Sequence, residues 1–429
     1  MDTGKTIRGV TRLVRAGGLL IVAAIVRRVI RSVMTTSKSA RDGGGASTRA
    51  PARPRIKTIV AVPPRGTAVV PADQRFAERF RAALRPSWLS LFKPTQRRTM
   101  VTPAKARLLE PGGSFLAESY TNPAGTRAYK LYVPAIYQGQ SLPLVVMLHG
   151  CTQTPDDFAA GTRMNVLAEE FECFVLYPAQ TPVANSSRCW NWFMAADQER
   201  GRGEPSLIAG ITRHVMKGYP VDKSRVYVAG LSAGGAMAAV MAMTYSDIYA
   251  AAGIHSGLPY AVAHDIGSAV ELMKEGSVPI GRRRADGVRA VKQSPHVVPS
   301  IVFHGDRDTT VHPRNADELV ARAANHGRRK ANGDAGNEAN VITHRGYVPA
   351  GHAYTRTIYH DTSGGQSILE QWRVHGAAHA WSGGSPSGSN TDPKGPDASR
   401  EMMRFFYEHS RPPGKALLHW LRSAVGIDS

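Results

Sequence analysis

Cysteine is scarce in this chain of 429 residues, and its three copies, Cys151, Cys173 and Cys189, exclude a disulfide-rich scaffold. No CxxC pair or His-rich tract suggests a zinc site, and we expect neither a metal nor an organic cofactor. Cys173 lies in the apolar run CFVLYP, which is typical of a buried strand. Cys151 and Cys189 are therefore left as the possible pair.

Acidic residues are few relative to basic ones: 33 Asp and Glu face 54 Lys and Arg, a formal net charge of +21. The imbalance is local, because residues 1–98 hold 21 basic and four acidic side chains. The charge thus belongs to an arm and not to a folded surface, so we expect no nucleic-acid partner. A catalytically inert protein that binds a surface or a nucleic acid is the alternative from another functional class.

The apolar run at residues 17–26 is too short to cross a membrane, which takes roughly 20 residues. Arg27 and Arg28 follow it without a small-residue cleavage site, so we expect no cleavable signal peptide. An extracellular, a cytoplasmic and a granule-associated location all stay open. The flanking arginines suit an interfacial helix on an anionic, granule or membrane surface, or else a solvated helix.

The composition of the sequence divides the chain into three segments. Residues 1–100 form the basic arm, with short helices but largely disordered, because residues 35–71 are rich in Gly, Ser, Thr, Pro and Arg. Residues 101–412 form one catalytic domain, and residues 413–429 form a tail. This division bounds where a functional site is expected.

Short apolar runs alternate with helical stretches within the domain. Strands are predicted at 142–148, 173–178, 225–230, 251–256, 300–305 and 368–374. Helices are predicted at 155–171, 206–217 and 233–245. The pattern indicates an α/β fold with a mostly parallel sheet covered by helices on both faces. Residues 112–134 alternate in polarity around a turn at 122–125 and predict an antiparallel hairpin at the sheet edge.

The sharpest motif is the run YVAGLSAGGAMAA, in which Gly230, Ser232 and Gly234 make G-x-S-x-G between a predicted strand and a predicted helix. A nucleophilic serine needs such a tight turn to present its hydroxyl, and glycines on both sides remove Cβ clashes. The helix N-terminus behind it favours developing negative charge. We therefore predict Ser232 as a nucleophile.

A serine hydroxyl needs a base and an orienting carboxylate, which follow in the order Ser, acid, His. The run DRDTTVHP after a strand offers Asp308, with Asp306 as competitor. The run VHGAAHAWSGG offers His379 in a Gly/Ala loop, with His375 at the strand end as competitor. We predict Asp308 and His379.

An oxyanion formed at Ser232 would need two backbone N–H donors. One comes from the residue after the nucleophile and the other from the loop after an earlier strand. These donors are predicted to be Ala233 and Cys151.

At these residues the sequence resembles the polyhydroxybutyrate-depolymerase family of esterases, which includes feruloyl and acetylxylan esterases and has the α/β-hydrolase fold. The matching runs, spread over residues 112–410, are PLVVMLHGCTQTPDDF, CWNWF, RVYVAGLSAGGAMA, IHSGLPY, VFHGDRDTTVHPRN and HAWSGG. The resemblance implies the same triad and a disulfide between Cys151 and Cys189. It also implies that the substrate meets Gln153, Trp190, Trp192 and Trp381.

The expected function is hydrolysis of a carboxylic ester through an acyl-enzyme. A poly- or oligo(3-hydroxybutyrate) or a related short-chain ester is the expected substrate. Feruloyl or acetylated cell-wall esters are the alternative within the class.

Overall fold

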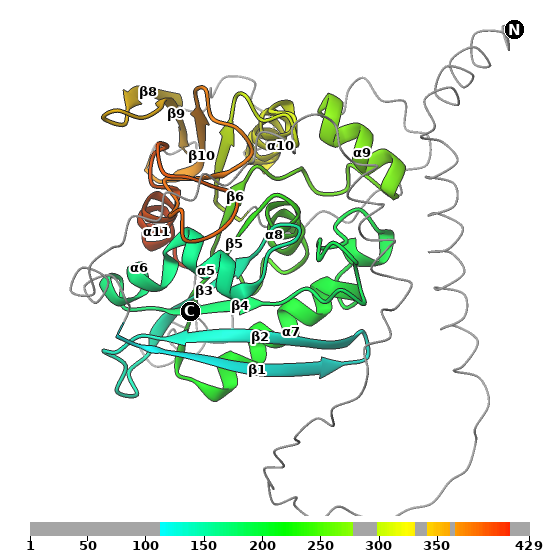
Figure 1. Ribbon diagram of the computed structural model, residues 1–429, viewed down its shortest axis with the longest axis vertical. Helices are drawn as coiled ribbons and strands as arrows, with labels where there is room; N and C mark the ends of the chain where they lie inside the picture. Colours follow the sequence, from blue (N-terminus) through cyan, green and yellow to red (C-terminus); the bar gives the residue numbers. More distant parts are fainter. Residues whose placement is uncertain (1–111, 278–297, 331–340, 361–364, 412–429) are drawn as a thin grey trace, which may run out of the picture. The chain divides into compact units, whose positions relative to one another are not determined.

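The computed structural model describes residues 112–277, 298–330, 341–360 and 365–411. Within them, ten strands form one sheet in the order β1-β2-β4-β3-β5-β6-β7-β10-β9-β8 (Figure 1). The predictions for the arm and for the tail lie outside the described residues. No helix in the described ranges is long and apolar enough to cross a bilayer.

The strand bounds are β1 (Ser114–Asn122), β2 (Gly125–Val133), β3 (Leu142–Leu148), β4 (Phe174–Pro178), β5 (Val221–Leu231), β6 (Ala251–His255), β7 (Ser300–Gly305), β8 (Val341–Tyr347), β9 (Ala353–His360) and β10 (Ser367–Val374). Strands β4, β3, β5, β6, β7 and β10 are parallel to their neighbours in that order. Antiparallel hairpins flank them, β1–β2 at one edge and β9–β8 at the other. The mostly parallel sheet and the first hairpin confirm the prediction.

Helices cover both faces of this sheet. Their bounds are α5 (Pro155–Thr162), α6 (Met164–Glu170), α7 (Gly203–Gly218), α8 (Ala233–Thr244), α9 (Ile266–Glu275), α10 (Arg314–Lys330) and α11 (Ala398–Tyr407). A single-turn 3-10 helix, η2 (Ala195–Gln198), and a pair of two-residue strands, β11 (Trp381–Ser382) and β12 (Thr391–Asp392), lie in the connections.

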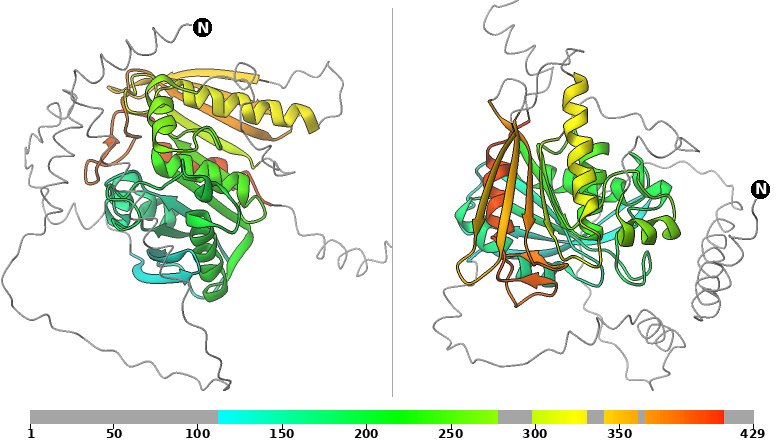
Figure 2. Two further views of the ribbon diagram at one scale, coloured as in Figure 1. Left: turned by 90° about the vertical axis from the view of Figure 1, so that its right-hand side faces the viewer. Right: turned by 90° about the horizontal axis from the view of Figure 1, so that it is seen from above.

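Strand β3 shows why two layers of helices are needed. All of its side chains are buried, and successive ones point to opposite faces of the sheet. Leu144 and Val146 join a core with α7 and α8, whereas Val145 and Met147 join a core with α5, α6 and α11. Figure 2 shows α10 and α11 on opposite faces, which agrees with their separate cores.

One predicted helix is broken in the structure. The stretch 155–171 forms α5 and α6, separated at Arg163, whose φ of 55° is left-handed. The N–H of Arg163 closes the last turn of α5 on the carbonyl of Ala159, and α6 begins at the next residue, Met164. The apolar spacing is the same on both sides of the break and does not mark it.

Candidate active site

Ser232 occupies a sharp bend between β5 and α8. Its backbone has φ 58° and ψ −119°, a conformation that non-glycine residues rarely adopt. A Cβ at Gly234 would lie 2.0 Å from the carbonyl oxygen of Leu148, and a Cβ at Gly230 would lie 2.3 Å from the carbonyl oxygen of Gly234. Both glycines are therefore required by packing. The bend holds the serine at the carboxyl end of a central strand, with 8% of its surface exposed.

The loop after β3 lies against Ser232. A Cβ at Gly150 would lie 3.6 Å from Cβ of Ser232, so the loop that continues to Cys151 passes beside Ser232. Among the described residues, neither the N–H of Cys151 nor that of Ala233 has a hydrogen-bond acceptor. Two backbone donors are thus available around Ser232.

Asp308 and His379 form a direct pair. The Nδ1 atom of His379 lies 2.6 Å from Oδ2 of Asp308, and the other carboxylate oxygen accepts the N–H groups of Thr310 and Val311 at 2.9 and 2.8 Å. Burial raises the pKa of Asp308, but hydrogen bonds from His304 and His379 outweigh it and hold that pKa well below its usual range. The carboxylate is therefore ionised at neutral pH and orients the ring of His379.

His304 is a second imidazole on the same carboxylate. Its Nε2 atom lies 3.3 Å from Oδ2 of Asp308 and 2.8 Å from the carbonyl oxygen of Val311. The ring is buried in β7, so nothing in the apolar run SIVFHG distinguished it from a core side chain. Sequence reasoning missed this contact, and only the neighbouring HG-x-x-D spacing hinted at it.

His255 connects the two halves of the site. Its carbonyl accepts the N–H of Ser232 at 2.9 Å, and its ring lies in the electrostatic field of His379 and Asp308. Among the described side chains, no hydrogen bond joins Ser232 Oγ to the His379 ring. Such contacts are often long in ligand-free enzymes and tighten when substrate binds.

The two competing residues pair with each other. Nδ1 of His375 lies 2.9 Å from Oδ2 of Asp306, and the other oxygen of Asp306 accepts the N–H of Gly376 at 2.7 Å. Thr355 Oγ1 occupies the Nε2 side of the same ring, at 2.8 Å. Asp306 and His375 are therefore engaged away from Asp308 and His379.

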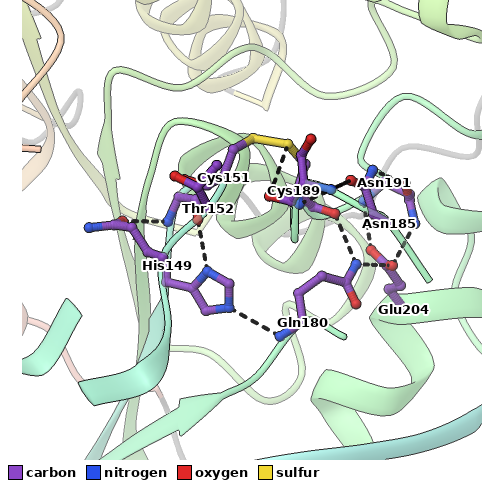
Figure 3. Close-up of a disulfide and its surroundings, with 11 residues drawn as sticks. His149, Cys151, Thr152, Gln180, Asn185, Cys189, Asn191 and Glu204 are labelled. Atoms are coloured by element: carbon purple, nitrogen blue, oxygen red, sulfur yellow. Dashed lines mark hydrogen bonds between the residues drawn. A yellow bond between two sulfur atoms is a disulfide. The ribbon is translucent and has the colours of Figure 1, made fainter. Parts of the chain in front are cut away.

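The disulfide that the resemblance implies is present. Cys151 and Cys189 are joined, while Cys173 is free and buried (Figure 3). The bond attaches the loop with the Cys151 donor to the segment that carries the CWNWF run.

The predicted substrate-contacting side chains are buried in this structure. Trp190, Trp192 and Trp381 expose 0, 5 and 1% of their surface, and Gln153 exposes 2%. The Gln153 amide accepts the N–H of Gly150 at 2.8 Å and donates to Asp157 at 2.9 Å. Contact of these side chains with substrate stays a prediction.

Two buried histidines make the fold sensitive to acid. Burial lowers the pKa of His149 from 6.5 to about 4 and, together with the charges of His304 and His379, that of His255 to about 3. Nε2 of His149 accepts the N–H of Gln180 at 3.0 Å, which requires a neutral ring. Acid therefore favours the unfolded state, in which these rings bind protons more readily.

We expect the unfolding free energy to fall as pH drops below 6.5, with His149 contributing about 1.4 kcal/mol per pH unit down to about pH 4. His149→Gln keeps an acceptor for the N–H of Gln180 but cannot titrate. The unfolding free energy of this variant should therefore fall with decreasing pH less steeply than that of the wild type, by the contribution of His149. Urea unfolding between about pH 6.5 and about pH 4.5 measures both slopes. Equal slopes in the two proteins would contradict the assignment of a neutral His149.

Comparison with known proteins agrees with this architecture. A sequence model of the family described as Esterase PHB depolymerase matches residues 127–335. Poly(3-hydroxyalkanoate) depolymerase C from Paucimonas lemoignei is 33% identical over 267 residues, which are 60% of this chain and 59% of that protein. The chain thus spans less than two thirds of that depolymerase's length.

Feruloyl esterase B from Neurospora crassa is 31% identical over 216 residues, which are 48% of this chain and 71% of that enzyme. The solved structure of an acetyl xylan esterase from Aspergillus awamori covers 69% of this chain and 100% of its own, with 22% identity and a TM-score of 0.52. This last likeness shows a shared fold, the α/β-hydrolase fold. On the sequence matches, the chain belongs to the polyhydroxybutyrate-depolymerase family of esterases.

Proposed function

We propose that this protein hydrolyses carboxylic esters through a covalent acyl-enzyme on Ser232. The observation that carries the proposal is the Asp308–His379 pair, at 2.6 Å, together with a serine held in a strained strand-to-helix bend. The carboxylate of the pair is buried and its imidazole is partly exposed. Neither a purely structural turn nor a binding scaffold requires this combination. The names of two relatives, a poly(3-hydroxyalkanoate) depolymerase and a feruloyl esterase, support the same reaction class.

Each residue has a defined role in the proposed reaction. Ser232 Oγ attacks the ester carbonyl carbon while Nε2 of His379 takes its proton, and Asp308 stabilises the resulting imidazolium. The tetrahedral oxyanion is held by the N–H groups of Ala233 and Cys151. His379 then protonates the leaving alcohol, and a water molecule repeats the sequence to release the acid.

The proposed substrate is an ester of a short hydroxyalkanoic acid, either an oligomer or a polymer. Its support is the resemblance to the poly(3-hydroxyalkanoate) depolymerase, which is 33% identical. A feruloyl or acetylated cell-wall ester is the second candidate, supported by the 31% identity to a feruloyl esterase. Surface attachment through the basic arm is a separate proposal that involves residues outside the described ranges.

A hydrolysis panel tests the substrate proposal. We expect kcat/KM for 3-hydroxybutyrate oligomers to exceed that for methyl ferulate and for acetylated xylan by more than about ten-fold, the selectivity that a pocket of fixed shape provides. p-Nitrophenyl butyrate serves as the reference for intact chemistry. A reversed order would favour the cell-wall esters, and turnover of none of the four would reject the proposed activity.

A further inference from the structure

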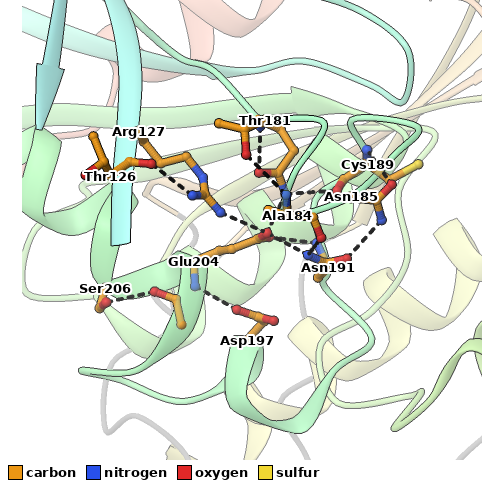
Figure 4. Close-up of polar contacts among 12 residues, drawn as sticks. Thr126, Arg127, Thr181, Ala184, Asn185, Cys189, Asn191, Asp197, Glu204 and Ser206 are labelled. Atoms are coloured by element: carbon orange, nitrogen blue, oxygen red, sulfur yellow. Dashed lines mark hydrogen bonds and ion pairs between the residues drawn. The ribbon is translucent and has the colours of Figure 1, made fainter. Parts of the chain in front are cut away.

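A buried carboxylate behind the CWNWF segment forms many hydrogen bonds that the proposed reaction does not use. Glu204, in the first turn of α7, is 3% exposed. Its Oε2 accepts the backbone N–H of Asn191 at 2.7 Å, and its Oε1 accepts the side-chain amide of Asn191 at 2.7 Å (Figure 4). Oε1 also accepts the side-chain amide of Gln180 (Figure 3). One carboxylate therefore holds both ends of the segment 180–191.

Cys189 is fixed between these two ends. The Gln180 amide also donates to the carbonyl oxygen of Cys189 at 3.0 Å. Asn185 accepts the N–H of Cys189 at 3.3 Å and donates to the Asn191 side chain at 2.9 Å. The sulfur of Cys189 thus projects from a segment that is anchored on Glu204.

The anchored segment holds the loop after β3 at three points (Figure 3). Cys189 is bonded to Cys151, Thr152 donates its N–H to the carbonyl oxygen of Ser187 at 2.6 Å, and Gln180 donates its N–H to His149 at 3.0 Å. The N–H of Cys151 lies in the middle of this loop. Movement of the segment therefore moves one of the two donors beside Ser232.

We propose that Glu204 is a positioning residue for the oxyanion hole, acting on the Cys151 N–H through the segment 180–191 and the Cys151–Cys189 disulfide. This inference rests on the proposed esterase function. Glu204 does not touch the reacting atoms, and its effect is geometric. Because an oxyanion-hole donor must lie within a few tenths of an ångström of its place, loosening the anchor reduces transition-state stabilisation more than substrate binding.

Burial and the charge of Asp197 favour a neutral group at position 204, whereas the charge of Arg127 opposes it. Arg127 lies 3.6 Å from Oε1, and Asp197 accepts the backbone N–H of Glu204 at 2.7 Å. Burial, followed by the charge of Asp197, raises the pKa of Glu204. The fold thus disfavours the charged form relative to water, so Glu204→Gln should fold. In that variant one carboxylate oxygen is replaced by an NH2 group, which cannot accept a hydrogen bond. Either the N–H of Asn191 or the side-chain amides of Gln180 and Asn191 therefore lose their acceptor.

The test compares Glu204→Gln, Cys151→Ser/Cys189→Ser and the combined variant, each on p-nitrophenyl butyrate. We expect Glu204→Gln to lower kcat by about 10- to 100-fold with KM changed less than about two-fold. In the disulfide-free background the same substitution should cost at least about three-fold less, because its main route to Cys151 is gone. Glu199→Gln, an exposed glutamate paired with Arg202, is the matched control and should keep kcat within about two-fold.

A transition-state analogue supplies a readout that a general structural role would not move. Alkyl trifluoromethyl ketones add to a nucleophilic serine and place an oxyanion between the same donors, so their Ki should rise by the factor by which kcat/KM falls. Unchanged kcat in Glu204→Gln, or effects that simply multiply with loss of the disulfide, would overturn the inference. If Glu204→Gln does not fold, Gln180→Ala, which removes the link to Cys189, is held to the same expectations. Wild-type protein without esterase activity would instead reject the proposed function itself.

Discussion

Ser232→Ala is expected to lower kcat for p-nitrophenyl butyrate by a factor on the order of 10⁶, the loss seen when a serine nucleophile is removed from an otherwise complete triad. Alanine keeps the strained bend, because Gly230 and Gly234 still permit the close packing on Leu148 and on each other. Only the attacking oxygen is lost. Thermal unfolding should therefore change little while turnover disappears.

The control for this variant is Ser119→Ala, which removes an exposed hydroxyl from β1 at the sheet edge. It should retain full activity. If Ser232→Ala kept more than a few per cent of wild-type turnover, with the contaminating activity of a mock purification subtracted, the nucleophile assignment would be wrong. That result would favour the alternative, a catalytically inert binding protein.

Asp308→Asn is expected to lower kcat about 10⁴-fold, because an amide cannot hold His379 in the tautomer that accepts the serine proton. Asp306→Asn should cost less than about ten-fold, since it weakens only hydrogen bonds to His375 and Gly376. Asp306 and Asp308 lie in one loop and are separated by a single residue. The pair of variants therefore separates a catalytic carboxylate from a structural one under matched conditions.

The histidine partners should follow the same order, with His379→Ala far more damaging than His375→Ala. Steady-state kinetics on p-nitrophenyl butyrate at neutral pH measures all four variants. Larger losses for Asp306 and His375 than for Asp308 and His379 would reverse the assignment. It would mean that the loops rearrange when substrate binds.

The sheet and the strand-to-helix bend at Ser232 were predictable because their signals are local. Buried parallel strands are apolar on both faces, and the Gly–Ser–Gly spacing follows from the close approach of α8 to Leu148. Strand β3 has the predicted bounds, and β5 extends beyond its predicted ends. The β8–β9 hairpin was not predicted from the sequence.

The choice within each Asp and His pair depended on tertiary structure. Asp306 continues past β7 and donates its N–H to the carbonyl oxygen of Val374, which brings its side chain to His375 at the end of β10. Asp308 lies one turn further on, where its carboxylate meets His379. Sequence spacing allowed both pairings, and only the parallel register of β7 and β10 distinguishes them.

The buried polar residues near the candidate site were not identified from the sequence. His255, His304 and Glu204 lie within apolar strands or at a helix start, and their partners are distant in sequence. No local pattern distinguishes a buried histidine from a core side chain before its hydrogen bonds are known. The three tryptophans are a different case: the resemblance implies that they meet the substrate, the structure buries all three, and their contact with substrate stays a prediction.

Peptide mapping by mass spectrometry after treatment with an alkyl fluorophosphonate tests the central claim most directly, because the reagent bonds only to an activated nucleophile. We predict one phosphonate group per chain, located on Ser232, with activity lost in proportion to labelling and no adduct in Asp308→Asn on the same timescale. A chain that hydrolyses esters but carries no adduct, or carries it on another residue, would contradict the account.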